Sequence, residues 1–157
     1  MSFLAELWRE VSRHLELNES VRRIAPMLAG RLPVDSIVLR RFDRDPIRLT
    51  TVATASANQE QLAELAASRT ECEAASAQEL VRFLSAGKVV LLSPSTSALA
   101  RALTPQGLRG GVMALPLTAN GRPLGAALLV ANPPHTLSEE HASAGQELVE
   151  PFSVAFE

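Results

Sequence analysis

Two apolar runs on either side of Asn120-Gly121 limit the folds open to this chain more than any other stretch. Asn-Gly is the strongest short-range signal for a two-residue β-hairpin, because a type I′ turn needs a positive φ at both central residues. With such a loop, Leu117 faces Leu124, and the pairing continues outward along residues 110–132. The segment therefore predicts two long antiparallel strands.

Both faces of this hairpin are apolar, because Val112 and Met113 begin a run in which neither alternate set of residues is polar. A sheet with one wet face would alternate apolar with polar residues, so the hairpin is predicted to be the covered centre of a sheet. Pro116 and Pro123 have no N–H to give to a ladder, which predicts a bulge or an end of pairing nearby.

The rest of the chain alternates helical and extended patterns. Helical spacing predicts helices at 3–15 and between Asn18 and Pro33, and β-branched residues predict a hairpin of strands. The polar segment 58–76 is interpreted as a short helix and a mobile crossover, and a final helix is capped by Thr136 or Ser138. The remaining expected elements are strands 34–43, 47–56 and 89–92 and helices 77–86 and 98–103. The order favours an α+β fold, one antiparallel sheet with helices stacked on its faces.

Composition excludes several classes of function. A net charge of −2 without a basic run gives no electrostatic support for direct nucleic-acid contact. No apolar run approaches the roughly 20 residues that cross a bilayer, and the N-terminus has no signal-peptide pattern. One cysteine, Cys72, leaves no disulfide framework or cysteine-rich metal site, and the three histidines lack metal-ligand spacing. We expect a cytoplasmic domain without metal or cofactor.

Three segments together resemble a GAF domain. They are the strand 112–118 ending in Pro-Leu-Thr, the strand 121–132 with its Leu-Gly-Ala-Ala-Leu pattern, and Leu-Ser-Glu-Glu-His at 137–141. GAF domains commonly show a strand ending in Pro-Leu, a tight turn, a Leu-Gly-x-Leu strand and a Phe-Ser/Thr-x-x-Asp helix start. Leu137 and His141 stand where the usual motif has Phe and Asp.

The two ends of the chain resemble one particular group of GAF domains. Leu-Trp-Arg-Glu-Val-Ser at 7–12 and Glu-Pro-Phe-Ser-Val-Ala-Phe-Glu at 150–157 look like the N-terminal GAF domain of sigma-54-dependent activators of the formate hydrogenlyase type. In that group the last helix continues into an ATPase domain. Because the chain stops at Glu157 inside a helical pattern, we expect residues 1–157 to be a single GAF domain cut from a longer protein.

The resemblance implies a central antiparallel sheet in the order 2-1-5-4-3, related to the PAS fold. The terminal helices would cover one face, and a ligand pocket would lie on the other face under 57–76 and 93–109. The implied function is non-catalytic: a sensory domain that binds a small molecule and controls an attached output domain.

Arginines and hydroxyls in the pocket-lining segments are the candidate ligand-binding residues. An arginine fork suits a carboxylate or a phosphate, so the expected ligand is anionic. The candidates are Arg69, Arg101, Arg109, Ser93 and Ser95.

Apolar stripes on the terminal helices predict a homodimer, since GAF domains often pair through such helices. The same stripes would also serve as core within one chain. The candidate interface residues are Leu4, Leu7, Trp8, Val11, Leu148, Val149, Phe152 and Phe156.

Several alternatives stay open. A ligand-free dimerisation module is indicated if large side chains fill the pocket. Cyclic-nucleotide binding is opposed by Pro133 after Asn132 and by Leu137, which break the Asn-Lys…Phe signature of such GAF domains. A methionine sulfoxide reductase or a bilin-binding domain would depend on Cys72 alone, and an inert thiol is the simpler interpretation.

Overall fold

The computed structural model describes residues 17–44, 47–56, 69–71, 74–93, 97–104, 111–131 and 136–156. Its helices are α2 (Leu17–Ala29), α4 (Ala74–Ala86), α5 (Ala98–Leu103) and α6 (Glu139–Phe156). Its strands are β1 (Val34–Asp43), β2 (Arg48–Ser56), β3 (Arg69–Glu71), β4 (Val90–Leu92), β5 (Val112–Ala119) and β6 (Arg122–Ala131). The helix expected at 3–15 lies outside the described residues.

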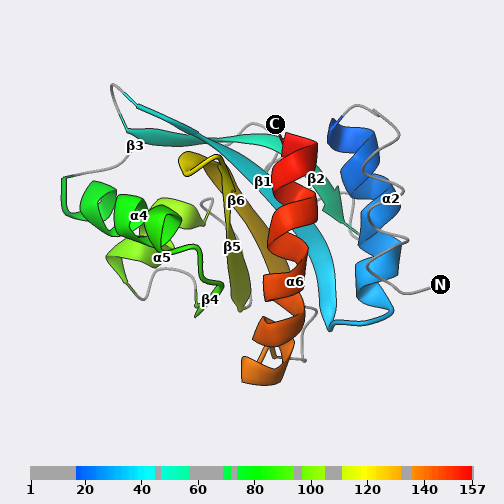
Figure 1. Ribbon diagram of the computed structural model, residues 1–157. Helices are drawn as coiled ribbons and strands as arrows, with labels where there is room; N and C mark the ends of the chain where they lie inside the picture. Colours follow the sequence, from blue (N-terminus) through cyan, green and yellow to red (C-terminus); the bar gives the residue numbers. More distant parts are fainter. Residues whose placement is uncertain are drawn as a thin grey trace.

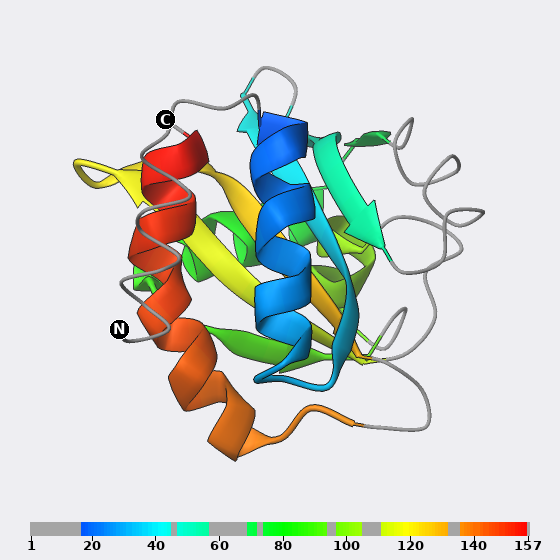
Figure 2. The same cartoon turned by 90° about the vertical axis from the view of Figure 1, so that its right-hand side faces the viewer.

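The sheet lies between two helical layers (Figure 1). Its strands run in the order β3-β2-β1-β6-β5-β4, and every pairing is antiparallel. Helices α2 and α6 lie side by side on one face, and α4 and α5 lie behind the sheet in the second view (Figure 2). The expected order 2-1-5-4-3 is therefore confirmed, with one additional short strand at the β2 edge.

That additional strand corrects one expectation. Residues 58–76 were interpreted as a short helix and a mobile crossover, and within them β3 pairs with β2 and α4 begins at Ala74 instead of Ala77. Residues 58–68, where the short helix would lie, are outside the described residues. A three-residue strand leaves too few alternating positions to produce a periodic signal.

Each face of the sheet has its own apolar core. The α2/α6 core contains Ile24, Leu28, Leu148 and Phe152 from the helices, packed on one set of side chains from the central strands. The α4/α5 core contains Leu80, Phe83, Leu84 and Leu103, packed on the alternate set. The hairpin β5–β6 is thus covered on both faces, as its two-sided apolar pattern predicted.

The turn of this hairpin is as expected, but its register is not. Asn120 and Gly121 have φ values of 53° and 77°, the positive values that a type I′ turn needs. Leu117, however, pairs with Gly125 and not with Leu124, because Leu124 is an extra residue in a bulge. The expectation of a bulge near the prolines is confirmed, and the pairing beyond it is shifted by one residue.

Because of this shift, the β6 residues beyond the bulge face the side of the sheet opposite to the one that the expected pairing gives. Ala127 and Leu129 join the α2/α6 core, whereas Ala126 and Leu128 join the α4/α5 core. The bulge also removes the Thr118 N–H from the regular ladder, and that group donates to Ser153 Oγ on α6 at 3.2 Å. The buried Ser153 on the helix thus accepts from an N–H group that has no partner in the ladder because of the bulge.

Two glycines allow close approaches, one between neighbouring strands and one between a helix and the sheet. A Cβ on Gly125 would lie 2.0 Å from the backbone oxygen of Arg40 on β1, and a Cβ on Gly145 would lie 2.3 Å from Met113 Sδ on β5. The first neighbour is rigid backbone and the second is a flexible side chain. Gly125 is therefore the more constrained position. Among the described helices, none is both long enough and apolar enough to cross a membrane.

Gly125→Ala should lower the free energy of unfolding by about 3 kcal/mol, because a methyl group forced against a strand backbone overpacks the sheet. Gly111→Ala is the matched control, since among the described residues its Cβ would meet only Leu92 O at 3.9 Å. It should change stability by no more than about 0.5 kcal/mol. Urea unfolding midpoints measure both, and equal midpoints for the two variants would contradict the close approach.

Candidate functional site

The face of the sheet under α4 and α5 is filled with side chains in the described part of the chain. Leu80, Phe83 and Leu84 of α4 and Leu103 of α5 are almost completely buried against Phe42 and Leu49 of the sheet. Filling by large side chains is the feature that the dimerisation-module alternative required. A ligand on this side of the sheet must therefore bind beside these residues and not among them.

Arg40 is the one charged side chain in this core, within the described residues. Its relative exposure is 0%, and it lies on β1 between Val38 and Phe42, which both face the same core. Because side chains alternate along a strand, Arg40 must point into the layer between the sheet and the two helices. The sequence analysis did not single it out.

The guanidinium of Arg40 joins α5 to the sheet. Its Nη1 donates to Leu103 O at 3.0 Å and to Ala102 O at 3.5 Å, and its Nη2 donates to Leu49 O at 3.0 Å. Ala102 and Leu103 end α5, where carbonyl groups lack helical partners and carry the negative end of the helix dipole. The buried cation thus caps a short helix from inside the core.

Both ends of α5 are capped by hydrogen bonds. Ser97 Oγ accepts from the Ala100 N–H at 3.0 Å at the start, and Thr104 N–H donates to Ala100 O at 2.9 Å at the end. A six-residue helix has little stability of its own, so these caps and Arg40 hold it in place.

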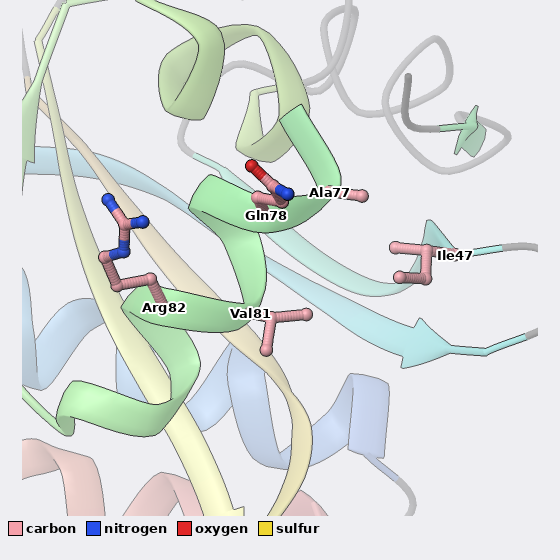
Figure 3. A pocket seen from close by; sticks show the side chains of 5 residues that line it. All are labelled: Ile47, Ala77, Gln78, Val81 and Arg82. Atoms are coloured by element: carbon pink, nitrogen blue, oxygen red, sulfur yellow. The ribbon is translucent and has the colours of Figure 1, made fainter. Parts of the chain in front are cut away.

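An open hollow of about 500 Å³ lies beside this core, between α4 and the start of β2. It is lined by Ile47, Ala77, Gln78, Val81 and Arg82. Figure 3 shows Ala77 and Val81 pointing toward Ile47, whereas Arg82 extends away from it. The walls are apolar and the polar groups stand at the rim, an arrangement that suits a small molecule with an apolar body and a polar end.

The predicted ligand-binding residues are spread over the sheet. Arg69 is on β3 at one edge, and Ser93 directly follows β4 at the other edge. The two edges are on the order of 20 Å apart at the usual strand spacing, so these two residues do not share one small ligand. Arg101 is exposed on α5. Arg109 and Ser95 lie outside the described residues.

The predicted interface residues on α6 divide into two groups. Leu148 and Phe152 are each 1% exposed and fill this chain's own α2/α6 core. Val149 and Phe156 are partly buried at the margin of that core, and Val154 is 44% exposed. The prediction of a second copy therefore depends on this margin, because Leu4, Leu7, Trp8 and Val11 lie outside the described residues.

The described residues include few side chains suited to metal binding or catalysis. Among these residues, no group of three acidic, histidine or cysteine side chains could hold a metal ion. His141 accepts a hydrogen bond from the Ser138 N–H through Nδ1 at 2.9 Å, so it helps cap α6. Ser138, one of the two residues expected to cap this helix, directly precedes α6, and its carbonyl oxygen accepts from the His141 and Ala142 N–H groups. Cys72 and the other two histidines lie outside the described residues.

Sequence reasoning missed Arg40 and the hollow for different reasons. For Arg40 a signal was available, because a charged residue stands there between the apolar Val38 and Phe42, which lie on the same face of a central strand. The hollow had no such signal, because Ile47 and Val81 are distant along the chain and meet only when α4 packs on the sheet.

Comparison with solved structures gives the fold. The chain matches the phycocyanobilin-bound GAF domain of a cyanobacterial phytochrome with a TM-score of 0.68 at 19% identity, covering 98% of this chain and 91% of that one. It matches the GAF domain of an Acinetobacter phosphoenolpyruvate-protein phosphotransferase with a TM-score of 0.68 at 17% identity, covering 99% and 94%. The chain therefore has the fold of GAF domains.

An enzyme shares this fold as well. The free methionine-R-sulfoxide reductase of Neisseria meningitidis, solved with its substrate, matches with a TM-score of 0.67 at 14% identity, covering 98% of this chain and 86% of that one. No protein-family model matches the chain, and no curated protein is recognisably similar in sequence. The fold alone thus does not separate sensor from enzyme.

Arg40→Met should lower the free energy of unfolding by about 2–4 kcal/mol, because buried carbonyl groups at the end of α5 and on β2 lose their donors. Arg40→Lys should lose part of this, since one ammonium nitrogen cannot occupy both Nη positions. Arg41→Met is the control: its side chain is 54% exposed and pairs with the partly exposed Asp43 at 3.4 Å. Chemical denaturation measures all three, and a stable Arg40→Met variant would show that the tie is dispensable.

Proposed function

We propose that this chain is a non-catalytic regulatory domain of GAF type that binds a small molecule and controls an attached output domain. Two features support the proposal: the fold, which is that of GAF domains, and the hollow beside α4, which lies across the sheet from α6. A ligand acts on the output only if it binds two arrangements of the helices with different affinity.

The output that we propose is a sigma-54-dependent transcriptional activator. The support is the likeness of residues 7–12 and 150–157 to the ends of that group's GAF domains. Reading the coding sequence beyond Glu157 tests this directly. An ATPase domain with a phosphate-binding loop, followed by a helix-turn-helix, is expected, and a stop codon, kinase or cyclase there would remove the transcription role.

A second candidate function is a dimerisation module that binds no ligand. The filled α4/α5 core favours it, because Leu80, Phe83 and Leu103 occupy space that a ligand could otherwise take. The two candidates differ in one measurable respect, namely whether any small molecule stabilises the folded chain.

A ligand in the hollow should raise the melting temperature with the logarithm of its concentration above Kd, by the equivalent of about 2.7 kcal/mol at one hundred times Kd. Small aliphatic carboxylates head the panel, with cyclic nucleotides as a second group. Ala77→Phe should abolish the stabilisation, because the new ring fills the space facing Ile47. Ser143→Phe at an exposed position of α6 is the matched control and should respond like the wild type.

Melting curves with and without each compound decide between the candidates. Stabilisation of the wild type and of Ser143→Phe, but not of Ala77→Phe, supports a ligand site at the hollow. If no compound of either group shifts the wild type, the ligand-free module is the better account. A cyclic nucleotide alone would support the cyclic-nucleotide alternative.

We propose that the domain forms a homodimer through the margin of the α2/α6 layer, with Val149, Val154 and Phe156 as the apolar contacts from α6. Val154→Asp should convert the dimer to a monomer, because a carboxylate in an apolar interface loses its hydration without gaining a partner. Ser143→Asp places the same charge on an exposed position of α6 and should leave the dimer intact. Light scattering after size exclusion measures both, and a monomeric wild type would rule the dimer out.

A further inference from the structure

One side chain reaches around the edge of the sheet and links the two helical layers. Gln146 Nε2 on α6 donates to Gly87 O at 2.9 Å, and Gln146 Oε1 accepts from the Val89 N–H at 3.0 Å. Gly87 ends α4 and Val89 precedes β4, so both partners belong to the connection between α4 and the edge strand.

The two partners lie two residues apart, where the chain leaves α4 in a turn at Gly87 and approaches β4. Gly87 O and the Val89 N–H both bind the same side chain. The carboxamide of Gln146 offers them one donor and one acceptor. It therefore fixes both the position and the orientation of the α4–β4 connection against α6.

The glutamine side chain both donates to Gly87 O and accepts from the Val89 N–H, and its nearest substitutes cannot do both. Glutamate at pH 7 keeps an acceptor for the Val89 N–H but has no donor for Gly87 O. Leucine has neither group. Gly87 has a φ of +69°, a value that residues with side chains rarely adopt, so the turn that presents Gly87 O depends on glycine.

The link bypasses the sheet. Helix α4 packs on one face through Leu80, Phe83 and Leu84, and α6 packs on the other through Leu148 and Phe152. Between them lie strands buried on both faces, which are closely packed and deform little. The Gln146 contacts give α4 a direct mechanical connection to α6 that runs outside this rigid layer.

We infer that Gln146 is a positioning residue that couples α4 to α6, so that displacement or loosening of α4 changes the order of α6. The identity of the trigger rests on the proposed function, in which a ligand in the hollow contacts Ala77 and Val81 of α4. The coupling itself is a property of the ligand-free chain. Its role is to carry a change at the hollow to the final helix.

The test is a double-mutant cycle read by residue-resolved amide hydrogen exchange in the absence of ligand. Arg82→Gly loosens α4 without removing a buried contact, because the Arg82 side chain is 77% exposed. It should raise exchange in α4 about fivefold through lost helix propensity. In the wild-type background we expect exchange at residues 142–148 of α6 to rise about threefold as well.

In the Gln146→Leu background, Arg82→Gly should still loosen α4 but should leave α6 exchange unchanged. An α6 response of equal size in both backgrounds would overturn the coupling. Glu147→Leu alters the neighbouring exposed position of α6 and should keep the wild-type response. If Gln146→Leu fails to fold, Gln146→Glu retains one of the two hydrogen bonds and should give an intermediate response, and a full response would again overturn the inference.

The outcomes separate this inference from the proposed function. A failed ligand screen removes the trigger, while a non-additive exchange cycle still establishes the link between the helices. An additive cycle removes the link, while stabilisation by a carboxylate would still establish the hollow as a ligand site.

Discussion

The structure depends on a sheet whose central strands are covered on both faces. A polar group buried in that layer cannot reach water, and an unsatisfied one costs about 1–3 kcal/mol. Arg40 illustrates how the fold meets this demand, since its guanidinium donates to carbonyl groups of α5 and β2 within the core. A buried charge and a short helix that is weak alone stabilise each other.

The same constraint explains the bulges. Near Arg40, β2 carries one residue more than β1, and near Pro123, β6 carries one residue more than β5. Between them, Gly125 lets the β1 and β6 backbones approach each other. Each bulge changes which side chains face which core, and the N–H that one of them leaves over is satisfied by Ser153 of α6.

Function in this fold is decided by what surrounds the sheet. Structures with the same strand arrangement include bilin-bound domains and a reductase, so the chemistry must come from side chains and not from the sheet. Here the described part of the α4/α5 face is occupied by leucine and phenylalanine, and an apolar hollow remains outside α4. The features particular to this chain therefore lie at α4 and its connections, among them the Gln146 hydrogen bonds that link this region to α6.

The sequence by itself determined the types and order of the main helices and strands, the Asn120-Gly121 turn and the burial of the β5–β6 hairpin on both faces. These follow from backbone preferences and from periodicity, which are local. Only the tertiary structure decided the β6 register, the β3 strand, and the partners of Arg40 and Gln146. The physical reason is distance along the chain: Arg40 meets Leu103 63 residues away and Gln146 meets Gly87 59 residues away, and no local pattern encodes contacts formed only when layers pack.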